Sequence, residues 1–119
     1  WPLLAASEAA WSPDNQVPQA MTRADMERVR DQFVAATRMA VEAGFDMVEL
    51  HAAHGYLLTQ FLSPVSNHRT DEFGGSYENR ARFPLRVAQA LRDAWPRTKA
   101  LGVRFNGSDW VEGGIALNY

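Results

Sequence analysis

The chain has no cysteine among its 119 residues. This absence excludes disulfide bonds, thiolate metal sites and a cysteine nucleophile. No apolar run approaches the roughly 18 residues that a membrane-spanning helix needs. The formal net charge is −2, so the chain has neither the basic field of a nucleic-acid-binding protein nor an acidic tail. We therefore expect neither a nucleic-acid partner nor a membrane partner.

The two ends of the chain lack the marks of natural termini. The sequence opens with Trp1-Pro2-Leu3, which offers no initiator methionine and no basic segment of a signal peptide. It stops at Tyr119, soon after the turn signal Gly113-Gly114. We therefore interpret the chain as a piece of a larger protein, and we expect a cytoplasmic location. Its apolar content of 46% is sufficient for a globular core.

The first half of the chain predicts a loop, a helix and a strand. Residues 1–21 are rich in proline and polar residues and are expected to form a surface connection. Thr22 is a predicted N-cap, paired with Asp25 in a variant of the capping box. Gly44 is suited to end the helix in a left-handed conformation. Apolar residues recur between them at helical spacing, namely Met26, Val29, Phe33, Ala36 and Ala40. Residues 45–51 then alternate as a strand does.

The second half repeats this order. One or two helical turns are expected over 57–62, followed by a long polar loop over 65–76, and such loops tend to be functional. Ser76 is a predicted N-cap for a helix that Pro96 stops. Pro84 requires either a kink in that helix or a regular part that begins near Arg82. The expected apolar stripe comprises Ala81, Leu85, Ala88, Leu91 and Trp95. Residues 101–106 form a second strand, and this order predicts an α/β unit with parallel strands.

Both predicted strands place polar side chains on one face. Glu49 and His51 share a face of the first strand, and Arg104 and Asn106 share a face of the second. A strand that carries such residues directs hydrogen-bonding groups toward a ligand or a polar interior. Arg104 would supply a fixed positive charge there, and an ion pair with Glu49 on the neighbouring strand is compatible with that role.

His51, His54 and Tyr56 lie within six residues at the end of the first strand. Parallel α/β folds place their ligands at the carboxyl ends of strands. Two histidines alone are a weak metal signal, because no third ligand is obvious, and we expect no metal site. They are either structural histidines or a clamp in which two imidazole N–H groups converge on one ligand oxygen. Tyr56 is either a packing residue or a proton donor.

The same residues resemble the old yellow enzyme family of FMN-dependent ene-reductases. The string from Glu49 to Leu58 resembles the substrate-site motif of that family. Further resemblance lies in 61–64, in 67–76, in 78–80 and in 103–105. The N-terminal residues are more similar to the coenzyme-A-ester branch, as in the C-terminal, flavin-reductase-like half of anthraniloyl-CoA or salicylyl-CoA hydroxylases.

The resemblance implies a fold and a set of roles. The fold is an α/β one, a fragment of a (β/α)8 TIM barrel in the order helix-strand-helix-strand. Residues 1–119 would form a partial FMN oxidoreductase domain that lacks the N-terminal and C-terminal barrel units. His51 and His54 would bind the substrate oxygen, Tyr56 would donate a proton to the substrate, and Arg104 would bind the cofactor beside its N1/O2 edge.

The implied activity is hydride transfer from NAD(P)H through FMN to the activated C=C bond of an enone or a related carbonyl or thioester. The partner would be a small-molecule substrate, and homo-oligomerisation is left open. The alternatives are a dienoyl-CoA reductase, a reductase-like domain of an aromatic CoA-ester hydroxylase, and a non-catalytic barrel that binds phenolic or carbonyl ligands. The isolated chain is expected to be inactive.

Overall fold

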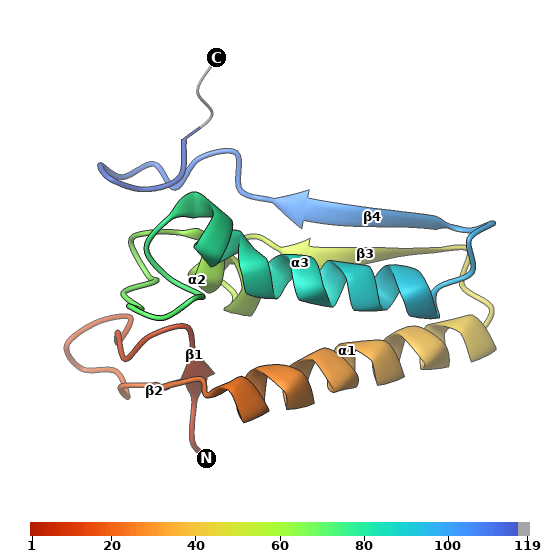
Figure 1. Cartoon of the computed structure of the whole chain (residues 1–119), viewed down its shortest axis with the longest axis horizontal. Coiled ribbons are helices and arrows are strands. Elements are labelled where there is room, and N and C mark those ends of the chain that lie inside the picture. The colour runs from red at the N-terminus through yellow and green to blue at the C-terminus, as the bar shows by residue number, and fades with distance from the viewer. Residues whose placement is uncertain (117–119) are drawn as a thin grey trace.

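A computed structural model describes residues 1–116. The elements follow the order β1, β2, α1, β3, α2, α3 and β4 (Figure 1). Their bounds are β1 Leu4–Ala5, β2 Gln19–Ala20, α1 Arg23–Glu42, β3 Met47–Ala52, α2 Leu57–Leu62, α3 Tyr77–Ala94 and β4 Ala100–Phe105. The predicted helix-strand-helix-strand order is confirmed, with α2 as a short helix after the first strand. No helix within residues 1–116 is both long and apolar enough to cross a membrane.

β3 and β4 pair in parallel, as predicted, with Met47 opposite Ala100 and Ala52 opposite Phe105. The alternation of β3 is also confirmed: Leu50 and Ala52 are buried, whereas Glu49 on the other face is exposed. Leu50 belongs to a core cluster that includes Phe83, Val87 and Leu91 of α3. The sheet therefore has one apolar face covered by helices and one polar face that remains accessible.

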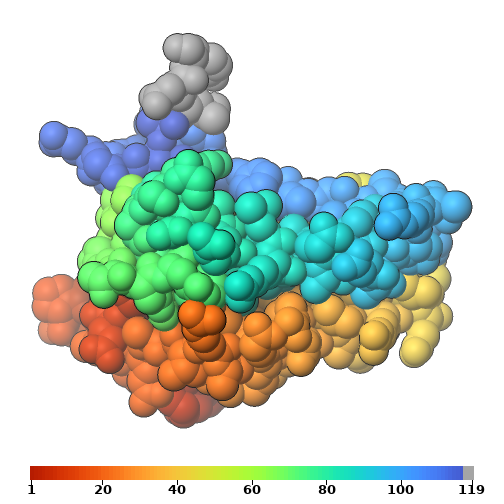
Figure 2. Space-filling view, viewed as in Figure 1, coloured from red at the N-terminus to blue at the C-terminus, as the bar shows by residue number. Residues whose placement is uncertain are grey.

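α1 begins at the predicted N-cap. The Thr22 hydroxyl accepts from the Asp25 N–H, and the Asp25 carboxylate accepts from the Thr22 N–H, so the capping box is complete. Gly44 takes a φ of 82°, as predicted for the residue after the helix. The expected apolar stripe is wrong at Ala36, which is exposed, while Thr37 is buried and donates to the Phe33 carbonyl at 2.9 Å. α1 packs along α3, and Figure 2 shows the two helices in contact on this face of the molecule.

α3 contains Pro84 within its span Tyr77–Ala94, so of the two alternatives left open by the sequence, a regular part that begins near Arg82 is wrong. Ser76 caps it as predicted, accepting from the Asn79 N–H. The apolar stripe is wrong at Leu85, which is 64% exposed. The buried face instead consists of Ala81, Phe83, Pro84, Val87 and Leu91. This face lies toward α1, α2 and the sheet, and Leu85 falls on the opposite side of the helix.

The predicted loop over 1–21 contains more order than its composition indicated. β1 and β2 pair in parallel, and Ala6 and Met21 are almost completely buried. Arg69, from the long loop that follows α2, joins these two segments. Its Nη1 donates to the Ala6 carbonyl at 3.0 Å and to the Met21 carbonyl at 2.8 Å. The N-terminal segment is therefore anchored by the guanidinium of Arg69, which follows Met21 by 48 positions and Ala6 by 63 positions in the chain.

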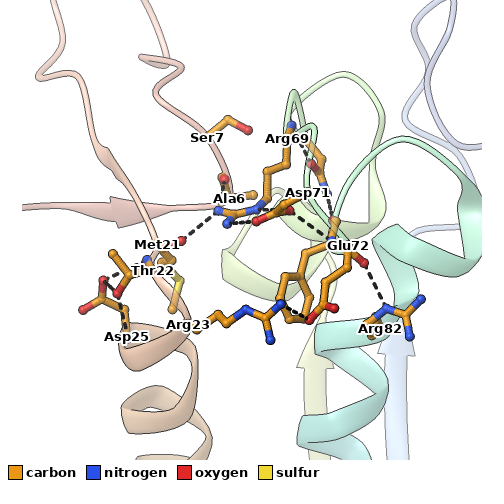
Figure 3. A network of polar contacts seen from close by, with 12 residues as sticks. Ala6, Ser7, Met21, Thr22, Arg23, Asp25, Arg69, Asp71, Glu72 and Arg82 are labelled. Atoms are coloured by element: carbon orange, nitrogen blue, oxygen red, sulfur yellow. Dashed lines mark hydrogen bonds and ion pairs between the residues drawn. The ribbon is translucent and has the colours of Figure 1, made fainter.

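Figure 3 shows how this anchor is held. Asp71 accepts from Nε and Nη2 of Arg69, which fixes the guanidinium in a bidentate pair. The pKa of Asp71 lies below its ordinary value, chiefly because of the hydrogen bonds from Arg69. Glu72 pairs with Arg23 of α1 at 3.0 Å, and its backbone carbonyl accepts from Arg82 of α3. The loop over 65–76 thus fastens the N-terminal segment to both long helices.

Two further features make this loop compact. The buried Asn67 amide donates to the carbonyls of Phe61 and Phe73 at 2.7 and 2.8 Å. A Cβ added to Gly74 would stand 2.1 Å from the Arg69 carbonyl oxygen, so only glycine allows this close approach. The polar residues of the loop therefore have a structural explanation in the described part of the chain.

Candidate functional site

The polar face of the β3–β4 sheet carries the residues predicted to act on a ligand. His51 and Arg104 are register partners in the parallel pair, so their side chains share this face. Arg104 Nε donates to Glu49 Oε1 at 2.7 Å, which is the cross-strand ion pair expected from the sequence. Both side chains of the pair are about half exposed, at 53% and 42%. The guanidinium therefore remains reachable by an anionic ligand while Glu49 orients it.

A tight turn brings the second histidine and the tyrosine back toward His51. His54 and Gly55 both have positive φ, at 60° and 75°, and the Tyr56 N–H donates to the Ala53 carbonyl at 3.2 Å. Positive φ at both central residues is typical of a type I′ turn, which reverses the chain sharply. Glycine adopts this conformation readily, whereas a histidine needs local support to hold it.

The turn gathers three rings. The centroid of the His51 ring lies 5.0 Å from that of His54 and 5.4 Å from that of Tyr56. The two imidazoles meet edge to face, with an interplanar angle of 68°. His51 is half-buried, His54 is exposed and Tyr56 is 63% exposed. The structure thus brings together the three residues that the sequence singled out, and solvent or a ligand can reach them.

The arrangement gives a chemical basis for a ligand clamp. Neutral imidazole offers one N–H donor, and two such donors on neighbouring rings can converge on one oxygen. The Tyr56 hydroxyl is a further donor and acceptor beside them. The roles of His51, His54, Tyr56 and Arg104 stay predictions. Within the described residues, no group of three or more His, Asp or Glu is placed to hold a metal ion.

Sequence reasoning missed the residues that support the turn. Asn106, at the end of β4, accepts from the His54 N–H at 2.8 Å. Asp109 accepts from the Asn106 amide at 3.2 Å and from the Ser63 hydroxyl at 2.6 Å. The only signal available was that Asn106 lies two residues after Arg104 on the same strand face. Ser63 and Asp109 are 46 residues apart, and no local pattern links them.

A separate hollow lies next to this turn, with a volume of about 730 Å³. Gly55 and Gln60 form one wall, and the N-terminal segment around Trp11 forms another. The rings of His51, His54 and Tyr56 do not line it. The polar sheet face is therefore the better candidate site, since it carries the convergent donors and the charge.

Known proteins are similar to this chain in sequence. An NADH:flavin oxidoreductase of Gibberella zeae is 50% identical over 93% of this chain and 26% of its own length. An NADPH dehydrogenase of Clostridium acetobutylicum is 43% identical over 97% of this chain and 34% of its own length. The chain thus spans about a third or less of these curated relatives. None of these names tests the expected coenzyme-A-ester branch, which stays a prediction.

Solved structures agree with the expected fold class. Morphinone reductase in complex with tetrahydroNAD superimposes with a TM-score of 0.85 at 31% identity, over 98% of this chain and 36% of that protein. The old yellow enzyme homologue from Zymomonas mobilis gives a TM-score of 0.84 at 30% identity, over 98% of this chain and 35% of that protein. The family model of the NADH:flavin oxidoreductase / NADH oxidase family matches residues 4–117. The chain belongs to this family, within the old yellow enzyme group, and its fold is a piece of the TIM barrel of that group.

Proposed function

We propose that this chain supplies the substrate clamp of an FMN-dependent oxidoreductase that uses NAD(P)H to reduce the activated C=C bond of an enone or a related carbonyl compound. Residues 1–119 would form part of a barrel domain whose other units bind most of the cofactor. The observation that carries the proposal is the cluster of the His51, His54 and Tyr56 rings at the end of β3, where Arg104 is the register partner of His51.

The residues present fit a bound flavin. FMN would supply hydride transfer. Arg104 places a guanidinium on the same face as His51, and its half-exposed state leaves it able to balance negative charge on a flavin ring. Gly102, opposite Glu49, adds no side chain to this face, and a Cβ there would stand 2.9 Å from the Met47 methyl carbon. The Met47 methyl group and the Glu49 side chain therefore occupy the space that a side chain at position 102 would fill.

Each protein residue has a separate task in this proposal. The N–H groups of His51 and His54 donate to the substrate oxygen, which draws electron density from the conjugated C=C bond and makes its β-carbon electrophilic. Such donors act more strongly when they are oriented before the substrate arrives. The Tyr56 ring lies next to that of His51, and its hydroxyl delivers the proton to the substrate α-carbon.

The clamp is tested by replacing each histidine in the FMN-bound protein and titrating para-nitrophenol by calorimetry. His51→Ala and His54→Ala each remove a hydrogen bond to a charged oxygen, which is worth roughly 1.5–3 kcal/mol. We expect affinity to fall about 10- to 150-fold, with FMN content unchanged. His68→Ala is the matched control, because His68 lies in the loop over 65–76, where its Nε2 is 2.9 Å from the Val65 carbonyl. Loss of FMN with unchanged phenol affinity would refute the clamp.

A further inference from the structure

Asn106 connects the predicted substrate clamp to the loop after β4. Its Oδ1 accepts from the His54 backbone N–H at 2.8 Å, and its Nδ2 donates to Asp109 Oδ1 at 3.2 Å. His54 is one of only two non-glycine residues with positive φ in the described part of the chain, the other being Trp110. The hydrogen bond that His54 donates to Asn106 therefore lies at the backbone position that needs support most.

Asp109 determines which way the Asn106 amide faces. Its other oxygen, Oδ2, accepts from the Ser63 hydroxyl at 2.6 Å and from the Ile115 N–H at 2.8 Å. Burial raises the pKa of Asp109, but the hydrogen bonds from Ser63, Ile115 and Asn106 outweigh it, and the pKa lies below its ordinary value. An ionised carboxylate only accepts hydrogen bonds. The amide nitrogen of Asn106 must therefore face Asp109, which directs the amide oxygen to the His54 N–H.

We propose that Asn106 is a positioning residue, oriented by Asp109 and Ser63, that holds His54 in the left-handed conformation in which its imidazole meets that of His51. This inference rests on the proposed function, because it assigns the purpose of the turn to the clamp. Asn106 itself acts through the His54 backbone and requires no contact with substrate. The geometry joins the end of α2, the turn after β3 and the loop after β4 through three side chains.

The direction of these hydrogen bonds allows a swap experiment. Asn106→Asp places two carboxylates side by side, and Asp109→Asn places two amide N–H groups side by side unless Asn106 turns its oxygen away from His54. The double variant Asn106→Asp/Asp109→Asn restores every bond. Its carboxylate at position 106 accepts from the His54 N–H and from the amide at position 109, whose oxygen still accepts from Ser63 and Ile115. If Asn106 and Asp109 acted only through their size and packing, the effects of the two substitutions would instead add in the double variant.

The readouts are the affinity for para-nitrophenol in the FMN-bound protein and the hydrogen-exchange rate of the His54 amide. Each single variant loses the hydrogen bond between positions 106 and 109, which orients the acceptor of the His54 N–H. We therefore expect each to weaken phenol binding about tenfold and to speed the exchange of the His54 amide by a similar factor. The double variant should recover both to within about threefold of wild type. Asn79→Asp is the matched control, since Asn79 accepts from Arg82 at the start of α3, and it should leave both unchanged.

Two results would overturn the proposal: single variants that leave the His54 amide as protected as in wild type, or a double variant no better than the single ones. Ser63→Ala keeps both the amide and the carboxylate, so it remains informative where a charge variant does not fold. It should change both readouts in the same direction by a smaller factor. A His54→Ala variant with unchanged phenol affinity would count against the clamp alone, because amide exchange reports on Asn106 independently of any ligand.

Discussion

Arg69 offers the most direct test of how the fold is held together. Its side chain is only 11% exposed, and its Nη1 bonds two backbone carbonyls, those of Ala6 and Met21. Arg69→Met keeps much of the aliphatic length but leaves both carbonyls without this donor. Each unsatisfied buried acceptor costs about 1–3 kcal/mol, so the expected loss of stability for the two carbonyls is roughly 2–6 kcal/mol. The pair with Asp71 adds little, because the carboxylate is 46% exposed.

Thermal unfolding followed by circular dichroism measures this loss. A deficit of this size should lower the midpoint by several degrees or more. Arg69→Lys should behave like Arg69→Met, because an ammonium group lacks the planar fork that reaches two carbonyls and Asp71 together. The matched control is Arg38→Met on the exposed face of α1, with an expected change within about 0.5 kcal/mol. Equal midpoints for the Arg69 and Arg38 variants would refute this account of the loop.

Two further predictions concern charge. The folded pKa of Asp71 lies below its ordinary value of 3.8, mainly because of the hydrogen bonds from Arg69. The stability that Asp71 contributes is therefore present above that value and is lost as pH falls through the folded pKa. Asp71→Asn should flatten the acid side of the curve of stability against pH, and an unchanged curve would contradict this assignment. Arg104→Met should lower the reduction potential of bound FMN, because a nearby positive charge favours the negative charge of the reduced flavin. Arg104→Lys keeps the charge and should preserve most of the potential. A potential that is unchanged or raised in Arg104→Met would contradict the cofactor role and leave Arg104 only its ion pair with Glu49.

β3, β4 and the helix caps could be predicted from the sequence because their signals are local. The alternation of β3 places Leu50 and Glu49 on opposite faces of the strand, whatever elements pack against it. Thr22 and Asp25 mark a helix start within four residues. The buried faces of the helices were harder to predict. α3 carries apolar residues on more than one side, so periodicity selected Leu85, whereas packing against α1 and α2 buries Phe83 and Val87.

In the candidate site, too, local features could be predicted from the sequence, whereas contacts between distant segments could not. The sequence predicted that His51, His54 and Tyr56 lie close together, because all three fall within six consecutive residues at a strand end. The supports come from distant segments: Asn106 reaches His54 across 52 positions, and Arg69 reaches Ala6 across 63. Side-chain to backbone bonds of this range depend on the completed fold and leave no periodic trace in the sequence.

The proposed chemistry is tested most directly by Tyr56→Phe in the two half-reactions of the FMN-bound protein, followed by stopped flow. The substitution keeps the ring beside His51 and removes only the hydroxyl. Flavin reduction by NAD(P)H should be nearly unchanged, because that step needs no proton from Tyr56. Reoxidation by an enone should slow by about 10²–10⁴-fold, the usual contribution of a positioned acid, whereas reoxidation by a quinone should slow much less, since its oxygens can take protons from water. Equal losses in both half-reactions, or no loss with the enone, would contradict the account.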